Sequence, residues 1–94
     1  MENSVIVAEV LEELHRIREK IETEHDSLAI ELGFPGYLKK IEESLSSGNL
    51  DKEMLKRYDF GIFRLVTESF AFQQSSLGKN LLSLGTKINN LRFE

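Results

Sequence analysis

Two Glu-x-x-His pairs, Glu12 with His15 and Glu22 with His25, are the residues whose types and spacing come nearest to chemistry. In di-metal helical bundles this spacing stacks a carboxylate and an imidazole one turn apart, both aimed into the bundle. Here both pairs lie on one predicted helix, about 15 Å apart, so they cannot share a site within one chain. We interpret them as exposed pairs and predict no metal and no cofactor. A metal-binding oligomer that uses both pairs across subunits is the alternative.

Motifs for covalent or phosphoryl chemistry are missing from the rest of the sequence. The chain has no Cys, which removes thiol nucleophiles and Cys-based zinc sites. Both His lie among carboxylates, and no Ser stands in a strand-to-helix turn. Asp59-Phe60-Gly61 matches a kinase tripeptide, but no Gly-rich loop accompanies it. The sequence therefore predicts a protein that is not an enzyme.

A small DNA-binding regulator is a second alternative, because basic residues gather in the middle of the chain. They are Lys39, Lys40, Lys52, Lys56, Arg57 and Arg64. Acidic residues are interleaved with them, at Glu42, Glu43, Asp51, Glu53 and Asp59. Phosphate binding needs clustered cations, so a mixed solvated face is the simpler interpretation and we do not expect nucleic acid as a partner.

The charge of the 94-residue chain is unevenly distributed. Its net charge is −4, but residues 1–31 hold nine acidic against three basic residues, whereas the remainder carries an excess of two bases. An acidic first segment favours association with a basic protein surface over phosphate. We expect neither a signal peptide nor a membrane span, because acids directly follow the short apolar patch near the N-terminus. We therefore predict a cytoplasmic protein that does not contact a membrane.

Apolar spacing predicts helices over about 4–25, 35–46, 52–73 and 76–91. Asn3 or Ser4 can cap the first, which lacks a strong breaker before Leu32. Gly33 and Pro35 separate the first two helices. Asp51 can cap the third, and Ser75 or Ser76 the fourth, although the break between these two is weak enough that they can be continuous.

The predicted helix 52–73 is rich in apolar and aromatic residues on more than one face. They are Met54, Leu55, Tyr58, Phe60, Ile62, Phe63, Leu65, Val66, Phe70 and Phe72. A helix that is apolar on most sides is central in a bundle, so we interpret these residues as core. Gly61 inside the helix predicts a kink or the close approach of a neighbouring helix.

Two heptad stripes, one near each end of the chain, predict contact surfaces. The first helix has apolar residues at spacings of three and four, and the last helix has a similar stripe flanked by two glycines that would let another backbone come close. We predict a partner or dimer interface on these residues: Val7, Val10, Leu14, Ile17, Ile21, Leu77, Gly78, Leu81, Leu84, Gly85 and Ile88.

Together these elements predict one all-α domain over residues 1–94, a bundle of three to four mostly antiparallel helices with a long N-terminal helix. The helix over 35–46 is about half as long as the first and would leave part of it uncovered. We therefore expect the protein to act by protein–protein contact, as a homodimer or on a basic partner.

The segment from Glu9 to Ile21 resembles the opening of many short bacterial helical proteins, which are antitoxin-like or of unknown function. The match is to a pattern E-x-x-x-I-R-E-x-I, carried by Glu13, Ile17, Arg18, Glu19 and Ile21, and covers less than a fifth of the chain. The resemblance implies an acidic helix that covers a basic toxin surface. Bacteriocin-immunity proteins offer a looser analogy of architecture.

Overall fold

The computed structural model describes residues 7–48 and 51–91. Its first helix, α1, is Val7–Glu24. The residues predicted to cap this helix, Asn3 and Ser4, lie outside the described residues. The interior of the predicted first helix is confirmed by α1, which buries Val10, Leu14 and two isoleucines on one side.

The helix does not run on to Leu32, as its lack of a strong breaker had allowed. His25 has a φ of 50°, which interrupts the helical hydrogen bonding. Asp26 then begins a new helix, α2 (Ser27–Glu31), by accepting a hydrogen bond from the backbone N–H of Ala29 at 3.1 Å. A short acidic residue in extended conformation is a strong helix cap, and here it decides the boundary.

The next helix, α3 (Phe34–Ser47), begins and ends at glycines in the left-handed conformation. Gly33 has a φ of 87° and Gly48 one of 77°. Pro35 lies in the first turn of α3, where a missing N–H costs no hydrogen bond. The predicted roles of Gly33 and Pro35 are confirmed.

The second half of the chain contains α4 (Lys52–Thr67), α5 (Phe70–Gln74) and α6 (Ser76–Asn89). Asp51 caps α4 and Ser75 caps α6, as predicted. The helix predicted to reach residue 73 ends at Thr67 instead, because Ser69 caps a separate short helix through the N–H of Phe72. The possible continuity of the last two predicted helices is therefore wrong.

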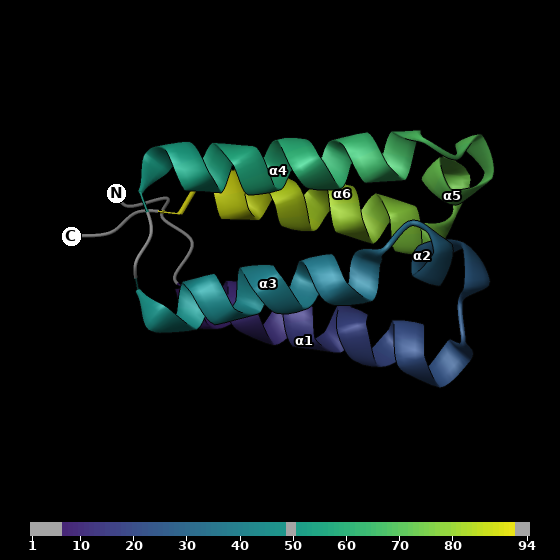
Figure 1. The fold of residues 1–94 in the computed structure, drawn as a ribbon, viewed down its shortest axis with the longest axis horizontal. Helices are drawn as coiled ribbons and strands as arrows, with labels where there is room; N and C mark the ends of the chain where they lie inside the picture. Colours follow the sequence, from purple (N-terminus) through teal and green to yellow (C-terminus); the bar gives the residue numbers. More distant parts are fainter. Residues whose placement is uncertain (1–6, 49–50, 92–94) are drawn as a thin grey trace.

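The four longer helices form two antiparallel pairs, α1 with α3 and α4 with α6, and the two short helices lie together at one end (Figure 1). The pairs are joined by contact of α1 with α6. The predicted all-helical bundle is thus confirmed. None of the described helices combines the length and apolar content that a membrane span requires.

The interior of the bundle is filled by side chains from all six described helices. The rings of Phe34 and Phe72 stack at 5.6 Å between centroids, which ties the start of α3 to α5. The rings of Tyr37 and Tyr58 meet edge to face at 6.3 Å, and the Tyr58 hydroxyl lies 2.7 Å from that of Ser44. These contacts join α3 to the second pair of helices.

Candidate functional site

The residues predicted to form a partner interface lie mainly in the core of the chain itself. Most of them are at most 5% exposed, namely Val10, Leu14, Ile17, Ile21, Leu77, Leu81, Leu84 and Ile88. Val7 packs against the same core and is partly buried. Both α3 and α6 contact α1, so the length mismatch that suggested an uncovered stripe is compensated within the fold. In this fold the eight buried side chains face the core of their own chain and not the solvent.

The two glycines of the α6 stripe are also used inside the molecule. A Cβ at Gly78 would lie 2.0 Å from the backbone carbonyl oxygen of Phe72, and one at Gly85 would lie 2.7 Å from the Asp59 carboxylate. Both glycines therefore allow close approach, as predicted, but the neighbours are α5 and α4. Gly61 similarly makes room for the hydroxyl of Tyr37 on α3.

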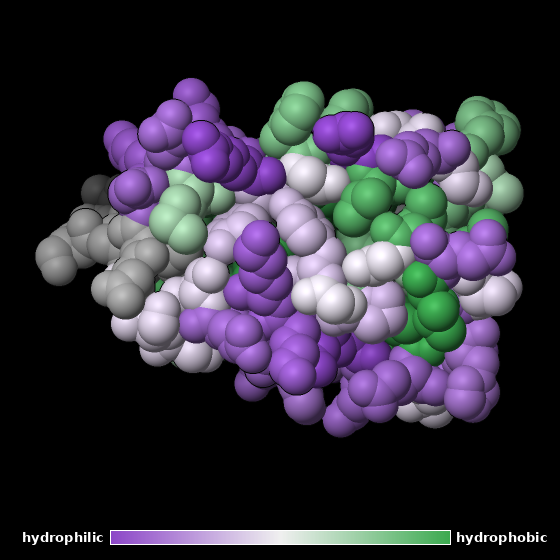
Figure 2. Space-filling view, in the orientation of Figure 1, coloured by the Kyte–Doolittle hydropathy of each residue, from purple (hydrophilic) through white to green (hydrophobic). Residues whose placement is uncertain are grey.

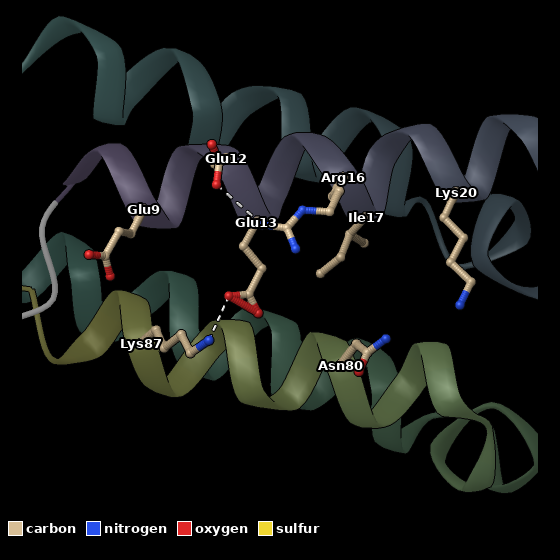
Figure 3. A pocket seen from close by; sticks show the side chains of 8 residues that line it. All are labelled: Glu9, Glu12, Glu13, Arg16, Ile17, Lys20, Asn80 and Lys87. Carbon is tan, nitrogen blue, oxygen red and sulfur yellow. Dashed lines mark hydrogen bonds and ion pairs between the residues drawn. The ribbon is translucent and has the colours of Figure 1, made fainter.

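A charged groove lies between α1 and α6 (Figure 3). Its lining consists of Glu9, Glu12, Glu13, Arg16, Ile17, Lys20, Asn80 and Lys87. Across it the Nζ of Lys87 donates to the carboxylate of Glu13 at 2.7 Å, while Arg16 turns along its own helix toward Glu12 at 3.4 Å. Both ion pairs neutralise part of the lining, and the pair of Lys87 with Glu13 joins α1 to α6. The charged residues of this groove therefore contribute to packing of α1 on α6.

The two Glu-x-x-His pairs do not converge. His15 lies 3.4 Å from the carboxylate of Glu19, on the exposed side of α1. His25 occupies the break between α1 and α2. Within residues 7–48 and 51–91, no three His, Cys, Asp or Glu side chains are grouped closely enough to hold a metal ion.

The outer side of α4 is exposed where the sequence predicted core. Leu55, Tyr58, Ile62 and Val66 are buried, as expected of a core helix. Phe60 and Phe63, however, are 66% and 51% exposed, and Phe70 on α5 is 76% exposed. Pale green hydrophobic side chains project from the edge of the molecule over α4 and again over α5 (Figure 2). The aromatic residues therefore divide between a core side and a solvent side.

The exposed rings of Phe60 and Phe63 border a groove of about 640 Å³ between α4 and α6. Its lining is Glu53, Lys56, Arg57, Asp59, Phe60, Phe63, Thr86 and Asn89. Helix α4 supplies the aromatic and charged groups, and α6 supplies the two neutral polar ones. We call this surface, together with the adjacent Arg64, the α4 face. It offers apolar contact and positive charge, but no described nucleophile paired with a base.

Asp59 is the partly buried carboxylate of the α4 face. Burial raises the pKa of its carboxyl group, because removing the charged form from water is unfavourable. The side chain lies against Gly85 of α6, where a Cβ would be 2.7 Å from its Oδ1. Its position fits a packing role at the floor of the groove.

A signal for the α4 face was present in the sequence. Lys56, Phe60, Phe63 and Thr67 follow one another at spacings of four, three and four, which places them on one stripe of a helix. The buried residues of α4 form another stripe on the opposite side. The existence of two stripes was visible, but which of them another helix would cover depended on the tertiary packing.

Comparisons of the chain with protein-family models, with curated proteins and with solved structures gave no match.

Proposed function

We propose that this chain is a non-enzymatic helical interaction module that binds another protein through the α4 face. The observation that carries the proposal is the exposure of Phe60 and Phe63 side by side on a helix whose opposite side already fills the core. Single exposed apolar residues are common, but paired aromatic rings beside a groove are typical of protein-binding surfaces.

The exposed rings of Phe60 and Phe63 cost free energy in water. Burying a phenylalanine side chain contributes about 1.5–3 kcal/mol relative to leaving it in water. The two adjacent rings are 66% and 51% exposed, so burying the remainder offers a partner about 2–3.5 kcal/mol. Because α4 is rigidly packed on its other side, little ordering of the backbone would accompany binding.

An antitoxin-like or immunity-like task is one form of such a module. The support for it is the acidic outer side of α1, where Glu9, Glu12, Glu19, Glu22 and Glu24 are exposed. The apolar stripe of α1 lies in the core, so a toxin or other basic protein would meet carboxylates there and no large apolar anchor. We therefore assign the principal contact to α4 and a supporting, electrostatic contact to α1.

The proposal is tested by placing a photo-crosslinking phenylalanine analogue at position 63 in the cells that produce the protein. The same analogue at Thr23, an exposed residue of α1, is the control position. We expect a discrete protein adduct from position 63 and none of the same mass from position 23. Equal adducts from both positions would show that the α4 face has no special role.

The adduct then identifies a partner for direct measurement. The purified partner is titrated against the wild-type protein and the variant Phe60→Ser/Phe63→Ser, with thermal unfolding as the check on folding. Both rings are more exposed than buried, so we expect the variant to fold normally. Its affinity should fall at least about tenfold, since two aromatic contacts are worth more than roughly 1.4 kcal/mol.

A further inference from the structure

We infer that the segment of the partner that occupies the α4 face is an acidic amphipathic helix. This inference rests on the proposed function and specifies the chemistry of its binding partner. It comes from two observations on the described residues: a straight helical stripe with aromatic side chains at its centre, and basic groups around that stripe that are not neutralised within the fold.

The shape of the site favours a helix. The stripe from Lys56 to Thr67 follows heptad spacing along the outside of α4, and the groove beside it runs between α4 and α6. A third helix fits into the groove between two helices that lie side by side. In helix-in-groove recognition an amphipathic helix lays its apolar face on an apolar surface, and Phe60 and Phe63 supply such a surface here.

The charge of the site favours an acidic occupant. Lys56, Arg57 and Arg64 are exposed around the two rings, and none of them makes an ion pair with another described residue. Helix α6, which forms the other wall, contributes Thr86 and Asn89 to the groove and contains no acidic residue. Against these cations the groove holds only Glu53 and Asp59. Carboxylates on the occupant would therefore gain from uncompensated positive charge.

The same charges disfavour a second copy of the chain. Arg57 and Arg64 are seven residues apart and lie on the same flank of α4. A two-fold antiparallel contact between α4 helices sets each flank against its own copy, so these arginines would face each other. Like charges in such positions are destabilising. The homodimer predicted from the sequence therefore finds no favourable surface on α4.

Nucleic acid would meet a different obstacle. Aromatic rings and cations together can bind single strands by stacking and phosphate contact. The groove, however, places the carboxylates of Glu53 and Asp59 beside the rings, where phosphates would approach. A helix can position its own polar or basic residues opposite these two carboxylates, whereas a phosphate backbone cannot.

The test uses designed helical peptides of about 18 residues, long enough to span the exposed side of α4. One peptide carries leucines at heptad spacing with glutamates on both flanks; in a second the glutamates are replaced by glutamine, and in a third by lysine. Binding to the full chain is measured by calorimetry at two salt concentrations. We expect the acidic peptide to bind at least about tenfold more tightly than the glutamine peptide, and its affinity to fall at high salt.

A charge-reversal pair locates the effect. Arg57→Glu/Arg64→Glu should weaken the acidic peptide by about tenfold or more and improve the lysine peptide. Lys39→Glu/Lys40→Glu makes a change of the same size at exposed positions of α3 and should leave both affinities unaltered. Equal loss from both variants would mean that only the net charge of the protein matters, and would overturn the inference.

The remaining outcomes separate this inference from the proposed function. If the glutamine peptide binds as well as the acidic one and Phe60→Ser/Phe63→Ser abolishes both, the α4 face binds protein without charge selection and only the inference fails. If no peptide binds and position 63 gives no specific adduct in cells, both fail. Displacement of the acidic peptide by an oligonucleotide would show that nucleic acid occupies the α4 face. A doubling of the protein's mass in solution that Phe60→Ser removes would show that a second copy occupies it. Either result would overturn the inference.

Discussion

At the scale of single residues, the fold depends on close approaches that only glycine permits. Gly78→Ala places a Cβ 2.0 Å from the carbonyl oxygen of Phe72, and a backbone atom cannot move aside as a side chain can. We expect a loss of about 1–3 kcal/mol in the free energy of unfolding, measured by chemical denaturation.

Gly36→Ala is the matched control, because no atom lies within 4 Å of a Cβ at that position in α3. This substitution should stabilise the protein by up to about 1 kcal/mol, since alanine is the better helix former. The packing described for α5 and α6 would be contradicted if Gly78→Ala left the free energy of unfolding unchanged, or if Gly36→Ala lowered it by a similar amount.

The carboxyl group of Asp59 gives a prediction on pH. Its pKa in the folded protein is raised above the ordinary value of 3.8 by burial, so the fold favours the protonated form. The stability linked to this group is present below pH 3.8 and is lost as the pH rises through the raised pKa. Asp59→Asn keeps the shape against Gly85 and removes the charge.

We therefore expect Asp59→Asn to raise the melting temperature at pH 7 and to leave it unchanged near pH 3, in thermal unfolding followed by circular dichroism. A gain of equal size at both pH values would show that the effect is not electrostatic. A loss at pH 7 would indicate that the Asp59 carboxylate makes a favourable interaction that its surroundings in the fold do not suggest.

At the scale of elements, the sequence predicted most of the helices but not all of their boundaries. Asp51, Ser75 and Gly33 were identified because caps and left-handed glycines act through local geometry. The predicted end of the first helix near residue 25 agrees with the break at His25, but continuation to Leu32 stayed open. Histidine carries no strong turn preference, and the cap of α2 depends on Asp26 reaching the N–H of Ala29. The early end of α4 depends similarly on Ser69.

His25→Gly tests the break by the sign of its effect. Histidine at a φ of 50° is strained, whereas glycine adopts that conformation freely, so the substitution should stabilise the protein by about 0.5–1 kcal/mol. If α1 instead continued through residue 25, glycine would destabilise the helix by about 1 kcal/mol. Chemical denaturation distinguishes the two signs.

The division of α4 into two sides explains what could and could not be predicted of the candidate site. The sequence shows that Leu55, Tyr58, Phe60 and Phe63 are apolar and lie on different stripes. It does not show how many neighbours the helix has. In the structure α4 packs chiefly on α6 and leaves one stripe in solvent, so residues that suggested a central helix became a surface.

At the scale of the whole molecule, the two heptad stripes of α1 and α6 face the same core. Leu14 is fully buried within one chain. Leu14→Ala should therefore cost about 2–5 kcal/mol of unfolding free energy, and the cost should not change with protein concentration. If the unfolding midpoint rose with protein concentration in the wild type, but not in Leu14→Ala, the stripe of α1 would form a subunit interface and not the core of one chain.

The arrangement that follows is a closed bundle with charge of opposite sign on its two pairs of helices. The α1 and α3 pair carries the acidic excess, and the α4 and α6 pair carries unneutralised cations beside two exposed aromatic rings. The stripes predicted as interface lie in the core of the bundle, and Phe60 and Phe63, which the sequence had assigned to the core, lie in the surface that we propose binds a partner.

The most direct test of this account is the affinity of the cross-linked partner, once purified, for the wild-type chain and for Phe60→Ser/Phe63→Ser. The account predicts that the variant keeps the melting temperature of the wild type and binds the partner at least about tenfold more weakly. Unchanged affinity in a folded variant would contradict the claim that the α4 face is where this protein makes its contact.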